Sequence, residues 1–185
     1  MYYFDPMYFV FALPGILFAL WASFYTKSTF ARYSQVRSGR GLTGAQAAAT
    51  MLAEQGVRDV VIEPVRGMLT DHYDPSSKTL RLSEQVYSSS SLAAVGVACH
   101  EAGHAMQDAT NYTRLGLRSV LVPATNFGSR FSYIVFFLGL LLRSRPLLMV
   151  GVGLFFMAVL FAIVTLPVEW NATARAKKAM VVSGI

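Results

Sequence analysis

The chain has 185 residues, of which 54% are apolar and only 14% are charged. Both values depart from those of soluble domains in the direction expected for a membrane protein. A net charge of +6 would suit nucleic acid if the cations shared one face with stacking aromatic rings. Instead, cations gather after the first and last apolar stretches: Lys27, Arg32, Arg37 and Arg40, and Arg175, Lys177 and Lys178. This placement follows the positive-inside rule, so we expect a lipid bilayer and no nucleic acid as partner.

The first element in chain order is an apolar run without charge. No charged residue lies between Asp5 and Lys27. A membrane-crossing helix needs about 20 apolar residues, and the run from Met7 to Tyr25 is close to that length. A cleaved signal peptide would carry basic residues before its apolar run, whereas here they follow it. We therefore expect residues 7–26 to form an uncleaved anchor helix, with the N-terminus outside and the next domain in the cytoplasm.

Residues 27–118 form the expected polar domain, which contains two helix signals. Thr43 can cap a helix that Gly56 ends. A second helix is expected to start at a serine cap, either Ser90 or Ser91, and to continue into a pair of histidines.

Strand signals lie between these two helices. The segment Val57 to Val65 is rich in Val and Ile, which favours a strand. Gly67–Tyr73 and Lys78–Ser83 flank Asp74-Pro75-Ser76-Ser77, a turn-forming sequence that predicts a β-hairpin. The strand Gly67–Tyr73 would then be an edge that can hold a substrate in extended form. Helices and a hairpin together predict an α+β domain.

Two further apolar segments, residues 119–142 and 146–168, follow this domain. The second carries no charge at all and is long enough to span a bilayer. The short connection Arg143–Pro146 allows only a tight helical hairpin. With the anchor this makes about three transmembrane helices, after which residues 169–185 return to the side of the polar domain.

The motif that carries chemistry is His100-Glu101-Ala102-Gly103-His104. Because His100 and His104 are four residues apart on a predicted helix, both imidazoles project from one face and can bind one metal ion. Glu101 lies beside them, where a carboxylate can take a proton from water, as metal-assisted peptide hydrolysis requires. By chance the pattern would occur in on the order of one chain in a hundred of this length. The helical context after a hairpin, which is the layout of zinc peptidases, favours the metal site.

A catalytic zinc needs a third protein ligand, and only Asp108 and Glu169 are acidic after His104. No histidine follows His104, which excludes the extended metzincin pattern. Asp108 lies one turn beyond His104 and would more naturally orient that ring. Glu169 ends a long uncharged stretch, where an ionised carboxylate is costly unless it is paired or metal-bound. Glu169 is therefore the stronger ligand candidate, and two membrane crossings return it to the side of His100; pairing with Arg175 is the alternative.

Several segments together resemble one known family. They are Lys27–Phe30, Gly41–Gly44, Leu69–Pro75, Arg81–Ser83, His100–His104, Gln107–Thr110 and Leu166–Glu169. Over nearly the whole chain they are similar to the YugP-type neutral zinc metallopeptidases of bacterial membranes, and more widely to membrane gluzincins such as the HtpX type. In many of those relatives an Asp follows the ligand Glu by four residues, whereas this chain has Thr173 there.

The resemblance implies a small zincin-like metallopeptidase domain of the α+β class, carried by transmembrane helices in the bacterial inner membrane. It implies Zn²⁺ held by His100, His104 and Glu169. It also implies that Glu101 acts as the general base. The expected activity is that of a zinc-dependent endopeptidase acting on membrane or membrane-associated proteins.

His72 is the remaining histidine. It could stabilise the oxyanion of a tetrahedral intermediate or approach the metal, or simply end a hairpin. Two other functions stay open at this point. A non-catalytic zinc-binding membrane protein would need a fourth ligand, for which the sequence offers His72 or Asp108. A membrane interaction protein would carry the histidine motif by accident and bind no metal.

Overall fold

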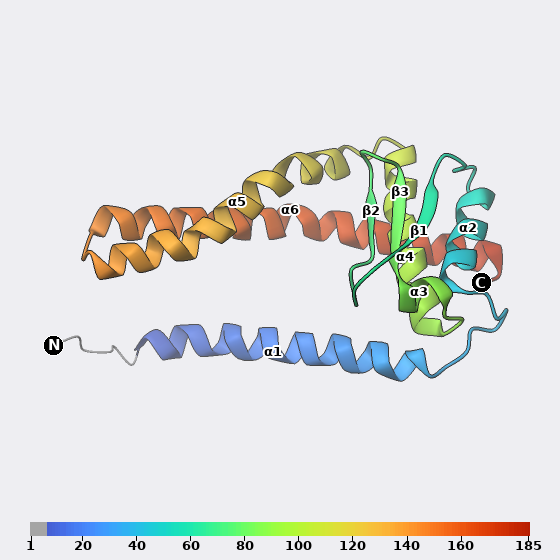
Figure 1. Cartoon of the computed structure of the whole chain (residues 1–185), viewed down its shortest axis with the longest axis horizontal. Helices are drawn as coiled ribbons and strands as arrows, with labels where there is room; N and C mark the ends of the chain where they lie inside the picture. Colours follow the sequence, from blue (N-terminus) through green and yellow to red (C-terminus); the bar gives the residue numbers. More distant parts are fainter. Residues whose placement is uncertain (1–6) are drawn as a thin grey trace.

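Over residues 7–185, which the computed structural model describes, the chain combines long helices with one small sheet. Within this range, the side chains of residues 7–9, 11 and 12 lie outside the description. The helices are α1 (Met7–Ser34), α2 (Gly44–Glu54), α3 (Glu84–Ser88), α4 (Leu92–Ala109), α5 (Thr113–Leu141) and α6 (Arg145–Ser183). The strands are β1 (Val61–Val65), β2 (His72–Asp74) and β3 (Thr79–Ser83). The expected α+β class is confirmed, and the three long helices extend to one side of a small domain (Figure 1).

Local capping sets the starts of the two helices predicted in the polar domain. At α2 the backbone N–H of Gln46 donates to Thr43 Oγ1 over 3.2 Å, and the Thr43 N–H donates to Gln46 Oε1 over 3.0 Å. This reciprocal pair is a capping box, which satisfies two otherwise unpaired donors of the first turn. Gly56, with a φ of 75°, follows the end of α2. At α4 the cap is Ser91, whose Oγ accepts from the Ala94 N–H over 3.2 Å.

The sheet has the strand order β1-β3-β2, so β2 lies at an edge. The predicted hairpin is confirmed, because β2 pairs antiparallel with β3, while β1 pairs parallel with β3. Two strands are shorter than expected: β1 begins at Val61 and β2 begins only at His72. Gly67 and Leu69 have φ values of 116° and 58°. These values lie outside the extended region, so the segment from Gly67 to Leu69 does not extend β2 toward its N-terminus.

The hydrophobic core joins the sheet to helices from both ends of the chain. Its fully buried side chains include Met51, Leu80, Leu82, Val86 and Cys99. The C-terminal part of α6 contributes a buried stripe at helical spacing, namely Val168, Ala172, Ala176 and Ala179. The C-terminal end of α6 is therefore part of the folded domain, whereas its first part leaves it. The helix runs through Pro167 without a break, so residues 169–185 continue the apolar helix rather than forming a separate element.

Among the described residues one helix, α6, is long and apolar enough to cross a membrane by length and composition. The expectation of about three transmembrane helices is thus supported for α6 and not for the others. In α5 the apolar sequence is interrupted by Arg118 and Arg130. The predicted anchor, residues 7–26, begins with side chains that lie partly outside the described set.

Helices α4 and α6 cross in close contact at Gly103. A Cβ atom built on Gly103 would lie 2.5 Å from the carbonyl oxygen of Ala172, which is well inside van der Waals contact. Only glycine lets the two backbones approach this closely. The crossing brings the middle of α6 against the histidine motif on α4.

We expect Gly103→Ala to push α6 away from α4 and to lower the free energy of unfolding by about 1–3 kcal/mol, the usual range for overpacking. Gly96→Ala is the matched control, because Gly96 lies on the same helix and no atom lies within 4 Å of its Cβ position. That control should be neutral or slightly stabilising. The measurement is thermal unfolding of both variants in one detergent. Equal melting temperatures would contradict the close crossing.

Candidate metal centre

Three potential metal ligands from two helices meet at this crossing. His100 and His104 come from α4 and Glu169 comes from α6, and one donor atom from each lies within 4.8 Å of the others. Glu169 Oε2 is 3.1 Å from His100 Nε2 and 3.4 Å from His104 Nε2. The four-residue spacing places both rings on one helix face, with ring centroids 5.1 Å apart. The structure therefore brings together the three residues that the sequence singled out as ligands.

The cluster is buried on one side and open on the other. The His104 side chain is only 4% exposed, whereas those of His100 and Glu169 are 28% and 37% exposed. Two imidazole nitrogens and one carboxylate oxygen are a ligand set that Zn²⁺ prefers, and catalytic zinc sites keep a position free for water or substrate. Both the donor set and the open side fit a catalytic zinc ion.

A buried glutamine orients His104 from behind. The Nδ1 atom of His104 is 2.9 Å from Gln107 Oε1. The Gln107 amide nitrogen donates to the Val168 carbonyl and to Asn171 Oδ1, both at 2.9 Å. Asn171 Oδ1 also accepts from Arg175 Nε over 2.8 Å. Because the amide nitrogen is used toward α6, the amide oxygen faces the ring and accepts from Nδ1–H. This leaves Nε2 of His104 as the free lone pair directed at the cluster.

A threonine has the corresponding position behind His100. Thr173 Oγ1 lies 3.1 Å from His100 Nδ1, one helical turn after Glu169. The Thr173 hydroxyl is thus in hydrogen-bonding contact with the ring. Both histidines thus have a partner on the nitrogen that faces away from the cluster.

The sequence reasoning missed Gln107 and Thr173 as partners of the histidines. It favoured Asp108 behind His104, but Asp108 Oδ2 instead accepts from the Tyr73 hydroxyl over 2.8 Å. The spacing of three residues between His104 and Gln107 was a usable signal, since such pairs share a helix face. No comparable signal links Thr173 to His100, because the two lie on different helices.

An arginine from α5 completes the surroundings of Glu169. Arg118 Nη2 lies 3.2 Å from Glu169 Oε1, so one carboxylate oxygen pairs with Arg118 and the other faces the histidines. The sequence reasoning named Arg175 as the alternative partner of Glu169. Arg175 instead contacts Asn171 and lies over the Tyr112 ring, 5.8 Å from its centroid. Arg118 was not predicted, because nothing in its local sequence marks it.

Glu101 lies next to His100 on α4 and is half-buried. Burial raises the pKa of the Glu101 carboxyl above its usual value, while the nearby His104 and His100 rings oppose the shift. A raised pKa brings a carboxylate closer to the range in which a general base works at neutral pH. Within the described chain, no protein group forms a hydrogen bond with this carboxylate, so it is available to a water molecule.

His72 and Asp108 do not join the cluster of donors found among the described residues. His72 lies exposed on β2, and its Nδ1 is 2.7 Å from the Thr70 carbonyl oxygen, to which it donates. The role of His72 near the metal or an oxyanion stays a prediction. The cluster of described residues therefore offers three ligands rather than four.

We expect Gln107→Leu to weaken zinc binding by about 10–100-fold, the usual cost of losing such a supporting partner. The Leu side chain cannot accept from His104 Nδ1–H, so the ring loses its fixed tautomer and orientation. Competition with a chromogenic chelator measures the affinity. Gln107→Glu keeps an acceptor for Nδ1–H but places an oxygen against the Val168 and Asn171 acceptors, so it should recover only part of the affinity. Thermal unfolding without metal controls for loss of fold. Unchanged affinity in Gln107→Leu would contradict the assigned role.

Comparison with known proteins agrees with this geometry. Residues 8–185 match the family described as "Putative neutral zinc metallopeptidase". The chain is 45% identical over 179 residues to a Bacillus subtilis (strain 168) protein named "Putative membrane protease YugP", and the match covers 96% of this chain and 80% of the relative. No solved structure matches the chain. On a match of this length and identity, the chain belongs to the neutral zinc metallopeptidase family.

Proposed function

We propose that the protein is a membrane-anchored, zinc-dependent endopeptidase that hydrolyses membrane or membrane-associated proteins. The observation that carries the proposal is the meeting of His100, His104 and Glu169 at one open-sided cluster, with Glu101 beside it. Structural zinc sites are closed by four protein ligands, whereas catalytic sites use three. A purely structural zinc site would need His72 or Asp108 as a fourth ligand, and both have other partners.

In this proposal each residue near the cluster has a separate task. His100, His104 and Glu169 would hold Zn²⁺, which when bound acts as a Lewis acid toward a carbonyl group and lowers the pKa of water. Glu101 accepts the proton of the attacking water and transfers it to the leaving amine. Its raised pKa makes the carboxylate a stronger base than an exposed glutamate, which favours its uptake of the water proton.

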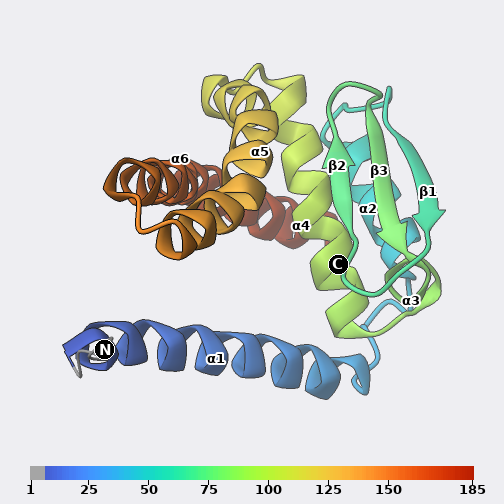
Figure 2. The same cartoon turned by 60° about the vertical axis from the view of Figure 1, so that its left-hand side comes forward.

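The sheet edge supports binding of substrate in extended form. Strand β2 pairs with β3 on one side only, and it lies against α4, which carries the histidines (Figure 2). An extended peptide can add to such an edge through main-chain hydrogen bonds. His72 at the start of β2 would then lie beside the bound peptide, where its proposed contact with the oxyanion could form.

The course of α6 supports a site close to the membrane surface. Glu169 follows the apolar part of α6, which is the helix long and apolar enough to cross a bilayer. Helix α5 is joined to α6 by a short turn at Arg143 and lies along it (Figure 1), so both helices share one environment. In the proposed orientation, the domain and the cluster face the cytoplasm of a bacterial cell.

We expect Glu101→Gln to retain zinc but to lose cleavage of unfolded casein by about 10²–10⁴-fold, the usual contribution of a general base. Glu169→Gln should lose zinc as well as activity, because a ligand is removed. Glu54→Gln, an exposed carboxylate on α2, is the control and should keep both properties.

Metal content by mass spectrometry and casein cleavage are measured on the same preparations. A wild-type protein that holds zinc but cuts no substrate would favour a non-catalytic zinc protein. A wild-type protein that takes up no zinc when zinc is supplied would overturn the proposal.

A further inference from the structure

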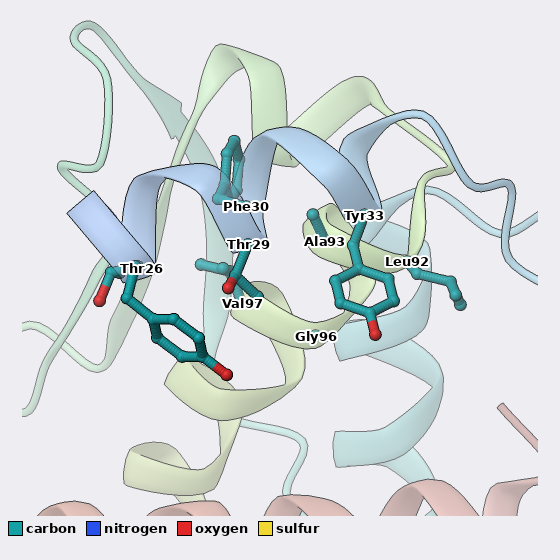
Figure 3. Close-up of a pocket in the computed structure, with 9 residues that line it drawn as sticks. Thr26, Thr29, Phe30, Tyr33, Leu92, Ala93, Gly96 and Val97 are labelled. Atoms are coloured by element: carbon teal, nitrogen blue, oxygen red, sulfur yellow. The ribbon is translucent and has the colours of Figure 1, made fainter. Parts of the chain in front are cut away.

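A groove outside the metal cluster lies between α1 and the N-terminal half of α4. Its volume is about 550 Å³, which is in the range of roughly 300–1,000 Å³ typical of ligand pockets. Figure 3 shows Thr29 and Tyr33 on the α1 side and Ala93 and Val97 on the α4 side. Aromatic and aliphatic side chains dominate this lining, so the groove suits an apolar group.

The α4 wall of this groove continues into the candidate metal centre. Positions 93, 97, 100 and 104 follow one another at spacings of four, three and four residues, which places them in one stripe along the helix. Val97 precedes His100 by about 4.5 Å of helical rise. The part of α4 that lines the groove therefore ends about one helical turn before His100 and Glu101.

The other wall is the end of a helix whose remaining length stands apart from α5 and α6. Both Figure 1 and Figure 2 show this separation, and the described contacts of α1 with other helices are mainly with α4. Large apolar side chains on α1, such as Phe18, Trp21 and Phe24, are exposed. On this side the groove continues into these exposed apolar side chains, because Tyr25 in its lining stacks on Trp21.

We propose that the groove binds a large apolar side chain of a membrane-protein substrate, at a position flanking the bond to be cut. This inference rests on the proposed peptidase function and assigns part of its substrate preference to α1. Continuity with the histidine stripe favours a substrate residue over any ligand unrelated to the site. The hydroxyls of Thr26, Thr29 and Tyr33 in the lining can hydrogen-bond a peptide backbone, which a lipid acyl chain cannot use.

Gly96 allows a direct test, because it lines the groove and no atom lies within 4 Å of its Cβ position. A Gly96→Leu side chain therefore starts in open space and extends into the groove. We expect this variant to lower the ratio of kcat/KM for Phe- over Ala-containing peptides by about tenfold or more, as usual for an apolar pocket that loses its space. Zinc content should not change. Gly153→Leu, at a helical glycine of α6 with equally open surroundings, should behave as wild type.

A second measurement needs no hydrolysis. Zinc-loaded Glu101→Gln in lipid nanodiscs is irradiated with a series of Leu/Ala peptides that carry one benzophenone side chain at successive positions. We expect crosslinks to Phe30 and Val97 from one position, and their loss when Gly96→Leu is added. If wild type cuts nothing, the peptidase function fails while this binding test still gives an answer.

Three outcomes would overturn the groove assignment. The first is an unchanged Phe-over-Ala preference in Gly96→Leu together with peptide crosslinks outside the groove. The second is labelling of the groove by a photoreactive acyl-chain lipid that the peptides do not displace, which would make it a lipid site. The third is a crosslink between two copies of the chain at these residues, which would make it a self-association surface.

Discussion

The close crossing of α4 and α6 is the contact on which the candidate site depends. Without a side chain on Gly103, the α4 backbone reaches the Ala172 carbonyl of α6. That approach places Glu169 against the two histidines and Thr173 behind His100. It also brings the α6 acceptors within reach of Gln107. One pair of helices therefore supplies the candidate ligands and the groups that orient them, so metal binding at this cluster would be linked to helix docking.

Helix α6 has an exposed apolar part followed by a part that is buried against the domain, and Glu169 lies where one changes to the other. Its first part is apolar and exposed, whereas Val168 and the residues that continue its stripe are buried against the domain. An ionised carboxylate at this junction is costly in a medium of low polarity unless it is paired. Arg118 and the histidines provide that pairing. The same charge arrangement prepares one carboxylate oxygen for a cation.

Helix α1 joins a stretch of exposed apolar side chains to the neighbourhood of the cluster. The C-terminal end of α1 packs on the half of α4 that precedes the histidines. The exposed apolar residues of α1 lie closer to its N-terminus. In the proposed function, α1 would both anchor the domain and form one wall of the groove near the cluster. The position of the domain relative to the bilayer and the choice of substrate residue would then depend on the same element.

The sequence by itself determined the features that depend on near neighbours. The cap at Thr43, the helical spacing of His100 and His104 and the turn after β2 follow from short-range geometry, and Glu169 stood out because few acids follow the motif. Only the tertiary structure decided which groups support these ligands. Thr173 and Arg118 reach them from other helices, and no local pattern records a contact between distant segments. Packing between helices, which depends on how closely their backbones approach and on the pairing of buried charge, determined which residues contact the cluster.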